Sequence, residues 1–241
     1  MNIKTEAIVL KTYKYSETAI IAKIYTKERG LLSFMVYGVR KKKSKFSAAF
    51  FQVLQALNLE ISYKEKSSLN TIKEVNILNN YTELHTNIYK STIAQFIGEV
   101  IFKSIQEQEV NTDLFSFINN STNILDEMSE SEIGNFHIVF LLNLSRFLGF
   151  YPHNNYGTSK KYFCIETGEF EIIQTHNKYF DQQQSKLLSN LLNSNYSNMQ
   201  NIKLSAKNRS MLLHGIIHFY KIQLPEMGEI QSLDVLEIIF E

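Results

Sequence analysis

The sequence predicts an α+β protein, in which a small five-stranded barrel precedes an α-helical domain that carries a β-hairpin insertion. Three observations lead to this fold class. Residues 1–80 contain short runs rich in β-branched and aromatic side chains, whereas from Tyr81 apolar residues recur every three or four positions. Between Gly149 and Asn177 the helical pattern breaks, and two short strand-like runs replace it. We therefore expect two domains, at 1–80 and 81–241, with a hairpin subdomain at about 151–176.

The first domain is predicted to hold five strands. In the fourth strand, Leu57, Leu59 and Ile61 alternate with polar residues, so we expect one face of the strand to be buried and the other to be exposed to solvent. The second is followed by Lys27–Gly30, a hairpin connection with glycine where a positive φ is often needed. The expected strands are Glu6–Tyr13, Thr18–Thr26, Leu31–Val39, Val53–Tyr63 and Leu69–Leu78. Such a set favours a closed barrel, and the OB-fold is the five-stranded barrel most often used to hold single-stranded nucleic acid.

Helical periodicity fills most of the second domain. Asn111 and the segment Ser129–Ser131 lie where N-cap residues are expected. The expected helices are 88–101, Asp113–Met128, Ser131–Leu148, Gln182–Leu192 and Ala206–Tyr220. The insertion is expected to be a hairpin of Tyr162–Ile165 and Glu169–Ile173 joined by Glu166–Gly168, and an apolar segment, Leu233–Phe240, follows Gly228.

Positive charge is concentrated in one stretch that follows the third expected strand. Residues 1–80 hold 14 Lys and Arg against 6 Asp and Glu, a net of +8, while residues 81–241 carry a net of −7. A polyanion bound across the stretch would relieve its self-repulsion and release counterions. A solvated surface loop with no partner is the alternative for such a charge run. The cations are Arg40, Lys41, Lys42, Lys43 and Lys45.

Five further residues are candidates for the same nucleic-acid site. Lys23, Lys27 and Arg29 lie in or just after the second strand and would extend the cationic track, although ordinary surface positions explain them equally well. Among the nearby aromatic residues, Tyr15 and Tyr37 stand near strand ends and are the better candidates for stacking on bases. Most aromatic side chains in barrels belong to the core.

Composition excludes several other classes of protein. The single cysteine, Cys164, excludes an internal disulfide and a cysteine-based zinc cluster, and it fits a reducing cytosol. Residues 1–11 carry three charges and no long apolar region, so no signal peptide is expected. The most apolar segment, Phe136–Phe150, is too short to span a membrane. We expect a soluble, cytoplasmic protein without a membrane role.

Chemical motifs are sparse. His214 and His218 lie one helical turn apart, which is a metal-ligand spacing, but Gly215 stands where a catalytic glutamate would follow the first histidine. Two polar helix positions are therefore favoured over a metal site. We find no phosphate-binding glycine loop, nucleophile elbow or paired-carboxylate nuclease motif. We expect no catalytic residues and no cofactor.

A family resemblance emerges from the order and spacing of short segments. In the first domain they are Glu6–Leu10, Tyr15–Glu17, Tyr25–Gly30, Gly38–Ser44, Phe51–Leu54 and Ile72–Val75. In the second they are Phe96–Val100, Asp113–Phe115, Leu148–Pro152 and Leu224–Leu233. With these segments the chain resembles the RecO family of bacterial recombination mediators over nearly its whole length, with Val53 where proline is usual.

The resemblance implies an N-terminal OB-fold, a helical domain and a protein without catalytic chemistry. Such proteins bind single- and double-stranded DNA and anneal complementary strands. They act with RecR to help RecA replace the single-strand-binding protein SSB, whose C-terminal tail they contact. It also implies a cytoplasmic, nucleoid-associated protein that takes part in DNA repair through the RecFOR pathway.

One departure concerns zinc. Many relatives hold a zinc ion with two Cys-x-x-Cys pairs after the helix, but the corresponding region here, Tyr151–Ile173, contains only Cys164. A structural site needs four ligands, and His153 and His176 would add two at most. We expect packing of Tyr162, Phe163 and Phe170 to hold the hairpin instead.

Two other functions stay open at this point. The protein could be an adaptor whose basic loop docks an acidic partner, such as RecR or the SSB tail. It could also be a metal-dependent nuclease or a related phosphoryl-transfer enzyme, although no sequence motif indicates this chemistry.

Overall fold

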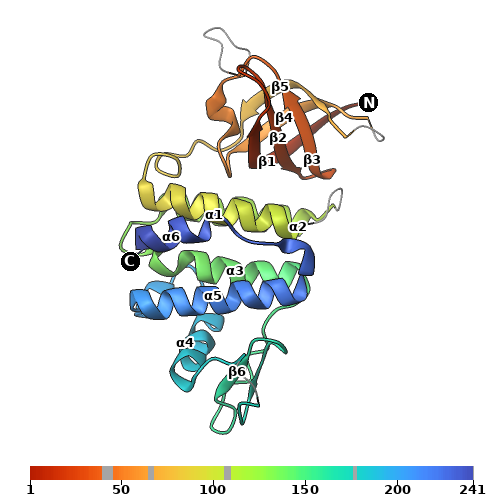
Figure 1. Cartoon of the computed structure of the whole chain (residues 1–241). Helices are drawn as coiled ribbons and strands as arrows, with labels where there is room; N and C mark the ends of the chain where they lie inside the picture. Colours follow the sequence, from red (N-terminus) through yellow and green to blue (C-terminus); the bar gives the residue numbers. More distant parts are fainter. Residues whose placement is uncertain (40–45, 65–67, 106–109, 176–177, 241) are drawn as a thin grey trace. The chain divides into compact units, whose positions relative to one another are not determined.

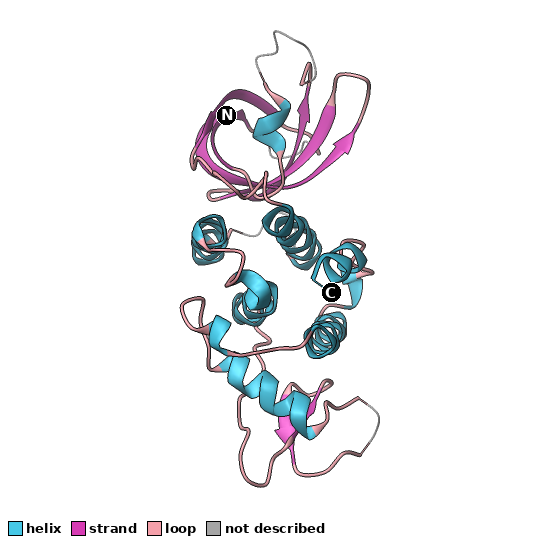
Figure 2. Cartoon of the chain, turned by 90° about the vertical axis from the view of Figure 1, so that its left-hand side faces the viewer, coloured by secondary structure: helices cyan, strands magenta, loops and turns pink. Residues whose placement is uncertain are grey.

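The computed structural model describes residues 1–39, 46–64, 68–105, 110–175 and 178–240 of the chain. These residues form two compact units, Met1–Glu127 and Met128–Glu241 (Figure 1). The first unit contains the strands of a barrel and two helices, and the second is helical apart from one small hairpin (Figure 2). The predicted α+β class is confirmed. The domain boundary at residue 80 stays a prediction; the compact units divide after Glu127, so that residues 81–127 group with the strands.

Five antiparallel strands form the barrel. In order along the chain they are β1 (Asn2–Lys14), β2 (Ile20–Thr26), β3 (Gly30–Val36), β4 (Ala56–Ser62) and β5 (Thr71–Ile77). The sheet order is β3-β2-β1-β4-β5, so the long strand β1 pairs with both β2 and β4. A parallel bridge between Phe34 and Asn70 joins β3 to the start of β5, with Asn70 N donating to Ser33 O at 2.8 Å. This closure gives the strand connectivity of an OB-fold.

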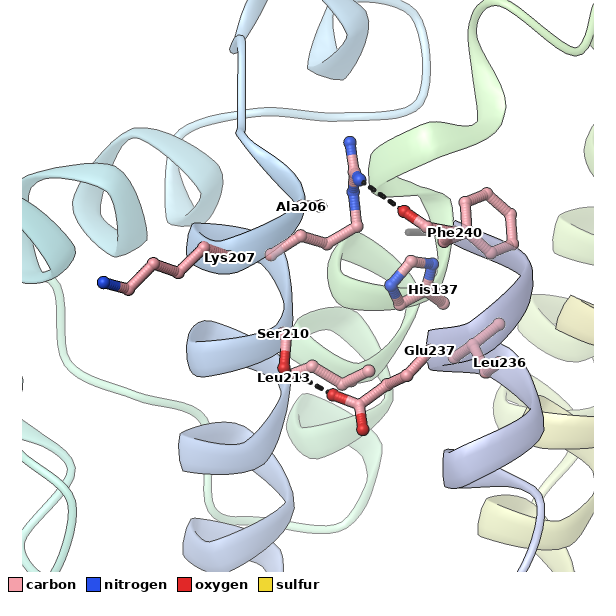
Figure 3. A pocket seen from close by; sticks show the side chains of 9 residues that line it. His137, Ala206, Lys207, Ser210, Leu213, Leu236, Glu237 and Phe240 are labelled. Atoms are coloured by element: carbon pink, nitrogen blue, oxygen red, sulfur yellow. Dashed lines mark hydrogen bonds between the residues drawn. The ribbon is translucent and has the colours of Figure 1, made fainter.

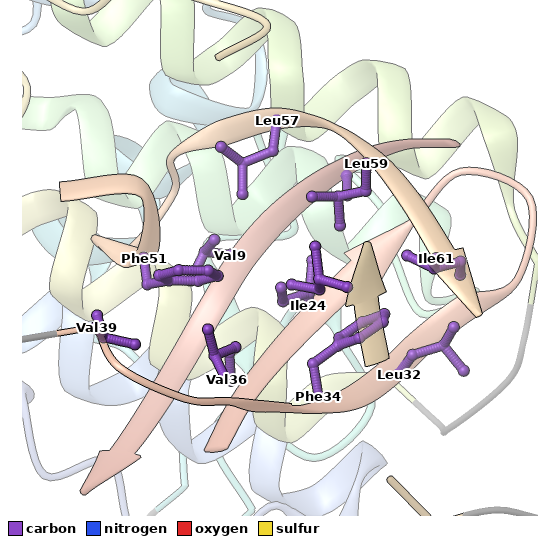
Figure 4. Close-up of a cluster of buried hydrophobic side chains, with 13 residues drawn as sticks. Val9, Ile24, Leu32, Phe34, Val36, Val39, Phe51, Leu57, Leu59 and Ile61 are labelled. Atoms are coloured by element: carbon purple, nitrogen blue, oxygen red, sulfur yellow. The ribbon is translucent and has the colours of Figure 1, made fainter. Parts of the chain in front are cut away.

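The barrel core follows from strand alternation. Figure 4 shows Ile24, Phe34, Val36, Leu57 and Leu59 converging on the barrel interior, and each is at most 5% exposed. A short 3₁₀ helix, Ala48–Phe51, supplies Phe51 as a plug at one end of this cluster. Residues between these positions therefore point to the outside of the barrel.

Two helices complete the first unit. Helix α1 (Ile88–Ser104) packs on the outer face of β1, where a Cβ built on Gly98 would lie 2.3 Å from Val53 Cγ1. Helix α2 (Thr112–Glu127) begins after Asn111, whose side chain accepts from Leu114 N at 2.8 Å, as the sequence predicts for an N-cap. Buried Lys90 donates to Asp126 O at 2.7 Å and so ties α1 to the end of α2.

The second unit is built from four helices and a hairpin within its described residues. They are α3 (Phe136–Phe147), β6 (Tyr162–Cys164), β7 (Glu169–Glu171), α4 (Gln182–Leu192), α5 (Ala206–Gln223) and α6 (Leu233–Phe240). Helix α4 starts with a capping box made by Asp181 and Gln184. Short 3₁₀ helices, Ile133–Asn135, Met199–Asn201 and Pro225–Met227, lie between the longer ones.

The predicted start of one helix is wrong. The sequence predicts a helix from Ser131, but α3 begins at Phe136 after a 3₁₀ turn. The buried Asn135 side chain donates to Met199 O at 3.0 Å and Ile202 O at 2.8 Å, which draws the preceding segment out of the helix axis.

Two glycines have the backbone conformation that their hairpin positions require: φ is 65° at Gly30 and 72° at Gly168. Across the described residues, no helix is both long and apolar enough to cross a membrane.

Candidate nucleic-acid interface

Three chain segments meet at one end of the barrel, which we call the barrel mouth: the link Tyr15–Ala19, the start of β2, and Tyr37–Val39 after β3. Ile20 pairs with both Lys14 and Val36, which fixes these strand ends side by side. Val39 N then donates to Thr18 O at 3.0 Å, so the two connections are hydrogen-bonded to each other. Arg40, Lys41, Lys42, Lys43 and Lys45 lie outside the described residues, and their flanks, Val39 and Phe46, pack against the barrel core.

The link that carries Tyr15 is tightly hydrogen-bonded. Tyr15 N and Ser16 N both donate to Ala19 O, at 3.0 and 3.1 Å, and Ser16 Oγ accepts from Ala19 N at 3.1 Å. Tyr15 is 61% exposed and Tyr37 is 68% exposed, so both rings are accessible at the mouth. The aromatic residues within β2 and β3, Tyr25 and Phe34, are instead fully buried.

Lys27 and Arg29 lie at the other end of the β2–β3 hairpin. Two antiparallel seven-residue strands separate this turn from the mouth by about 20 Å. Lys27 Nζ lies 2.8 Å from Glu6 Oε2, and this hydrogen bond and charge raise the pKa of the lysine. The Arg29 guanidinium lies 5.2 Å from the Tyr63 ring centroid. The structure does not bring these two cations together with the mouth.

Lys23 lies midway along β2, and the register places it directly opposite Lys11 of β1. Lys11 Nζ in turn lies 5.4 Å from the ring centroid of Tyr13, which is 41% exposed. Reasoning from the sequence missed Lys11 and Tyr13, because only the register of β1 with β2 reveals that they continue the outer surface of the hairpin. Simple alternation from the core residue Val9 would place Lys11 and Tyr13 inside the barrel, and the bulge between Val9 and Lys11 turns them outward.

The second unit has a pocket of about 300 Å³ between α3, α5 and α6 (Figure 3). Leu213, Leu236 and Phe240 supply apolar walls, and Lys207 and Arg209 supply positive charge. Ser210 Oγ donates to Glu237 Oε1 at 2.5 Å, and His214 Nε2 lies 3.0 Å from the same oxygen. His214 thus contacts the Glu237 carboxylate on the surface of α5, and His218 is exposed.

Burial sets the electrostatics of this pocket. It lowers the pKa of the Arg209 guanidinium, whose Nη1 donates to Phe240 O and whose Nη2 donates to Leu204 O, both at 3.4 Å. Burial, with a smaller contribution from the charge of Arg209, lowers the pKa of His137 to about 3, so that this imidazole is neutral at neutral pH. Arg209 therefore provides a half-buried positive charge at the rim of an apolar hollow.

Comparison with known proteins identifies the family. Residues 1–81 match the family model described as Recombination protein O N terminal, and residues 85–229 match the one described as Recombination protein O C terminal. The chain belongs to the RecO family. The first model covers the barrel and the second covers α1 to α5, so both parts of the RecO architecture are present.

Individual RecO relatives match over their full length. The DNA repair protein RecO of Flavobacterium johnsoniae is 35% identical over 243 residues, covering 100% of both chains. Those of Bacteroides fragilis and Phocaeicola vulgatus are 34% and 33% identical, covering 99% and 98% of both chains. Membership of this family gives the chain a role in DNA repair and recombination.

The zinc site that the RecO resemblance implies does not fit the residues of this chain. Cys164 is buried in β6, and His153 lies near Glu169, with Nδ1 and Oε1 3.7 Å apart, while His176 falls outside the described residues. No group of three or more His, Cys, Asp and Glu side chains forms a possible metal site in the described part of the chain. Aromatic rings occupy the centre of the hairpin subdomain instead: the ring centroid of Phe163 lies 5.1 Å from that of Phe170 and 5.7 Å from that of Phe180.

Proposed function

We propose that this protein is a non-catalytic recombination mediator that binds single- and double-stranded DNA and anneals complementary strands. With RecR, it would help RecA replace SSB on single-stranded DNA. Membership of the RecO family supports this proposal, as does the net positive charge of residues 1–80 against the net negative charge of residues 81–241. The observation that carries it is the closed OB-type barrel, from whose mouth the most basic stretch of the chain continues.

In the proposed mechanism, Arg40, Lys41, Lys42, Lys43 and Lys45 bind phosphates and do not read bases. Lys23 would extend the cationic track along β2, and a strand long enough to reach the other end of the hairpin would also contact Lys27 and Arg29. Tyr15 and Tyr37 would stack on bases. Two strands held on one basic surface repel each other less, because the cations replace their condensed counterions. Annealing would follow from this reduced repulsion.

Binding of fluorescent single-stranded DNA across a salt series tests the proposal. The log of the affinity should fall with the log of the salt concentration, with a slope of about −0.7 per phosphate contacted. Replacing the five loop cations by alanine should weaken binding to all sequences alike and flatten the slope. Unchanged affinity and slope in this variant would show that the stretch does not bind DNA.

Two rival functions are separated by further assays. An adaptor whose basic loop docks an acidic protein would bind RecR or the SSB tail but would not anneal strands. A nuclease would cleave strands in the presence of a divalent metal ion. Strand annealing without divalent metal is the outcome that the proposal requires.

We further propose that the pocket between α3, α5 and α6 receives the C-terminal tail of SSB. A C-terminal tail ends in a carboxylate, which Arg209 and Lys207 would pair with, while Leu213, Leu236 and Phe240 would contact its apolar side chains. A peptide with the tail sequence should bind the wild-type protein, and Arg209→Gln should weaken it about tenfold or more. Lys203→Gln, outside the pocket, is the matched control. Equal binding by the Arg209→Gln variant would place the tail elsewhere.

A further inference from the structure

The outer face of the barrel at its mouth has a regular composition. Figure 4 shows Ile24, Phe34 and Val36 pointing into the barrel, so Lys23, Ser33 and Met35 between them point out. The register then places side chains in rows across β1, β2 and β3. Lys11, Lys23 and Ser33 form one row, and Tyr13, Ile21 and Met35 form the next.

Two more tyrosines continue this face beyond the last paired residues. Tyr15 directly follows the last residue of β1, and Tyr37 directly follows the last residue of β3, and both side chains are exposed. The link between them is fixed by the hydrogen bonds of Ala19 and Val39. We call this surface the tyrosine face and define it by Tyr13, Tyr15, Ile21, Met35 and Tyr37.

The other half of the same outer surface is covered. Tyr25 is 1% exposed, its hydroxyl donates to Asn111 O at 3.3 Å, and its ring lies 6.3 Å from that of Phe115 in α2. Leu31, opposite Tyr25 on β3, is buried as well. The strand face that an OB-fold uses for oligonucleotides is therefore accessible only toward the mouth.

Exposure singles out the tyrosine face. Among all tyrosine and phenylalanine side chains of the described residues, Tyr13, Tyr15 and Tyr37 are the exposed ones. Tyr13 lies near the end of β1, and Tyr15 and Tyr37 directly follow the ends of β1 and β3, so the three exposed rings are gathered at the mouth of the barrel. The Lys11 ammonium lies beside the Tyr13 ring, so a cation accompanies the rings.

From this arrangement we infer that the tyrosine face stacks on unpaired bases and makes the barrel prefer single-stranded over duplex DNA. The inference rests on the proposed DNA-binding function and adds Tyr13 and Lys11 to its site. Phosphates are available for contact in both forms of DNA, whereas the faces of bases in a duplex are already stacked on each other and are not available to the rings. Rings that need an unstacked base therefore contribute only to single-strand binding.

The test compares two triple variants on a single-stranded oligonucleotide and on a duplex of the same length. Replacing Tyr13, Tyr15 and Tyr37 by leucine removes the rings and should weaken single-strand binding about tenfold or more, with duplex binding unchanged. Replacing the same residues by phenylalanine keeps stacking and should leave both affinities at the wild-type level. An abasic oligonucleotide should bind the wild type as weakly as the normal oligonucleotide binds the leucine variant.

A second measurement needs no variant. Photo-crosslinking of 5-iodouracil-substituted single strands to the wild-type protein should give adducts at Tyr13, Tyr15 or Tyr37. Wild-type single-strand affinity in the leucine variant, equal loss in both triple variants, or adducts confined to other residues would each overturn the inference. Absence of any DNA binding by the wild type would instead refute the proposed function, so the two failures are distinguishable.

Discussion

At the scale of single residues, Gly215 shows why one position of a helix must lack a side chain. A Cβ built there would lie 2.1 Å from Phe180 Cζ, so the ring packs directly on the helix backbone. The same glycine breaks the metalloprotease-like pattern between His214 and His218. Gly215, which in the sequence argues against a metal site, is therefore the position at which the Phe180 ring packs on the backbone of α5.

This contact predicts the effect of Gly215→Ala. Alanine gains about 1 kcal/mol of helix propensity, but overpacking against Phe180 costs about 1–3 kcal/mol, so we expect a net loss of up to about 2 kcal/mol. Urea unfolding measures it. Gly157→Ala, at a position with no atom within 4 Å of the added Cβ, is the matched control and should be nearly neutral. Adding Phe180→Leu should recover part of the loss, and strictly additive effects would contradict the proposed contact.

His137 predicts a pH dependence of stability. Its pKa is lowered to about 3 by burial, and to a lesser extent by Arg209, whereas the unfolded chain titrates near 6.5. Between these values the unfolded state binds one more proton, so the contribution of neutral His137 is complete above pH 6.5 and is lost as the pH falls below it. The slope from this residue reaches at most about 1.4 kcal/mol per pH unit.

The corresponding experiment compares urea unfolding at pH 5 and pH 7.5 for the wild type and for His137→Leu. We expect the variant to lose less stability on acidification than the wild type does. His218→Gln changes an exposed histidine and should retain the wild-type dependence. A parallel pH dependence of wild type and His137→Leu would show that this imidazole is not the titrating group.

At the scale of elements, the hairpin module is held by packing against its neighbouring helices. Phe163 N donates to Ser185 Oγ of α4 at 2.8 Å, and the Phe163 ring lies 6.3 Å from that of Phe219 in α5. Next to it, a Cβ built on Gly168 would lie 3.0 Å from the Phe219 ring. These contacts replace the constraint that four metal bonds would impose.

We therefore expect the module to be stable without zinc. The purified protein should contain well below one zinc ion per chain, and a chelator should leave its thermal unfolding unchanged. Phe163→Ala should cost about 3–5 kcal/mol, because it opens a cavity in the aromatic cluster. Ile173→Ala, at a 65% exposed position, is the control. Stoichiometric zinc, or a chelator-dependent melting temperature, would contradict this account of the module.

The sequence predicts elements well where one periodicity dominates. The five barrel strands and the hairpin match the runs predicted from alternation and turn residues, and α4 has the bounds predicted from its helical periodicity. Contacts between residues far apart in the sequence could not be predicted from these local patterns. The bonds of Asn135 to the Met199–Ile202 segment shorten α3, and the pairing of Lys11 with Lys23 creates the surface that adds Tyr13 to the site.

At the scale of the whole molecule, net positive charge is concentrated in the first 80 residues and net negative charge in the rest of the chain. Residues 1–80 carry a net of +8 and residues 81–241 a net of −7, although the total is only +1. An acidic remainder repels the same polyanion that the barrel attracts, and it does so over distances set by the salt concentration. We expect this repulsion to limit non-specific adhesion to DNA.

The expectation is tested by neutralising exposed carboxylates far along the chain from the barrel. Glu226→Gln, Glu229→Gln and Asp234→Asn together should raise the affinity for duplex DNA by about two- to fivefold at low salt, mainly through a faster association rate. The difference should vanish near 1 M salt, where the Debye length is about 3 Å. An increase that persists at high salt would indicate a direct DNA contact in this region. No increase at low salt would show that the acidic part does not act on DNA at a distance, because long-range repulsion must respond to the loss of three negative charges.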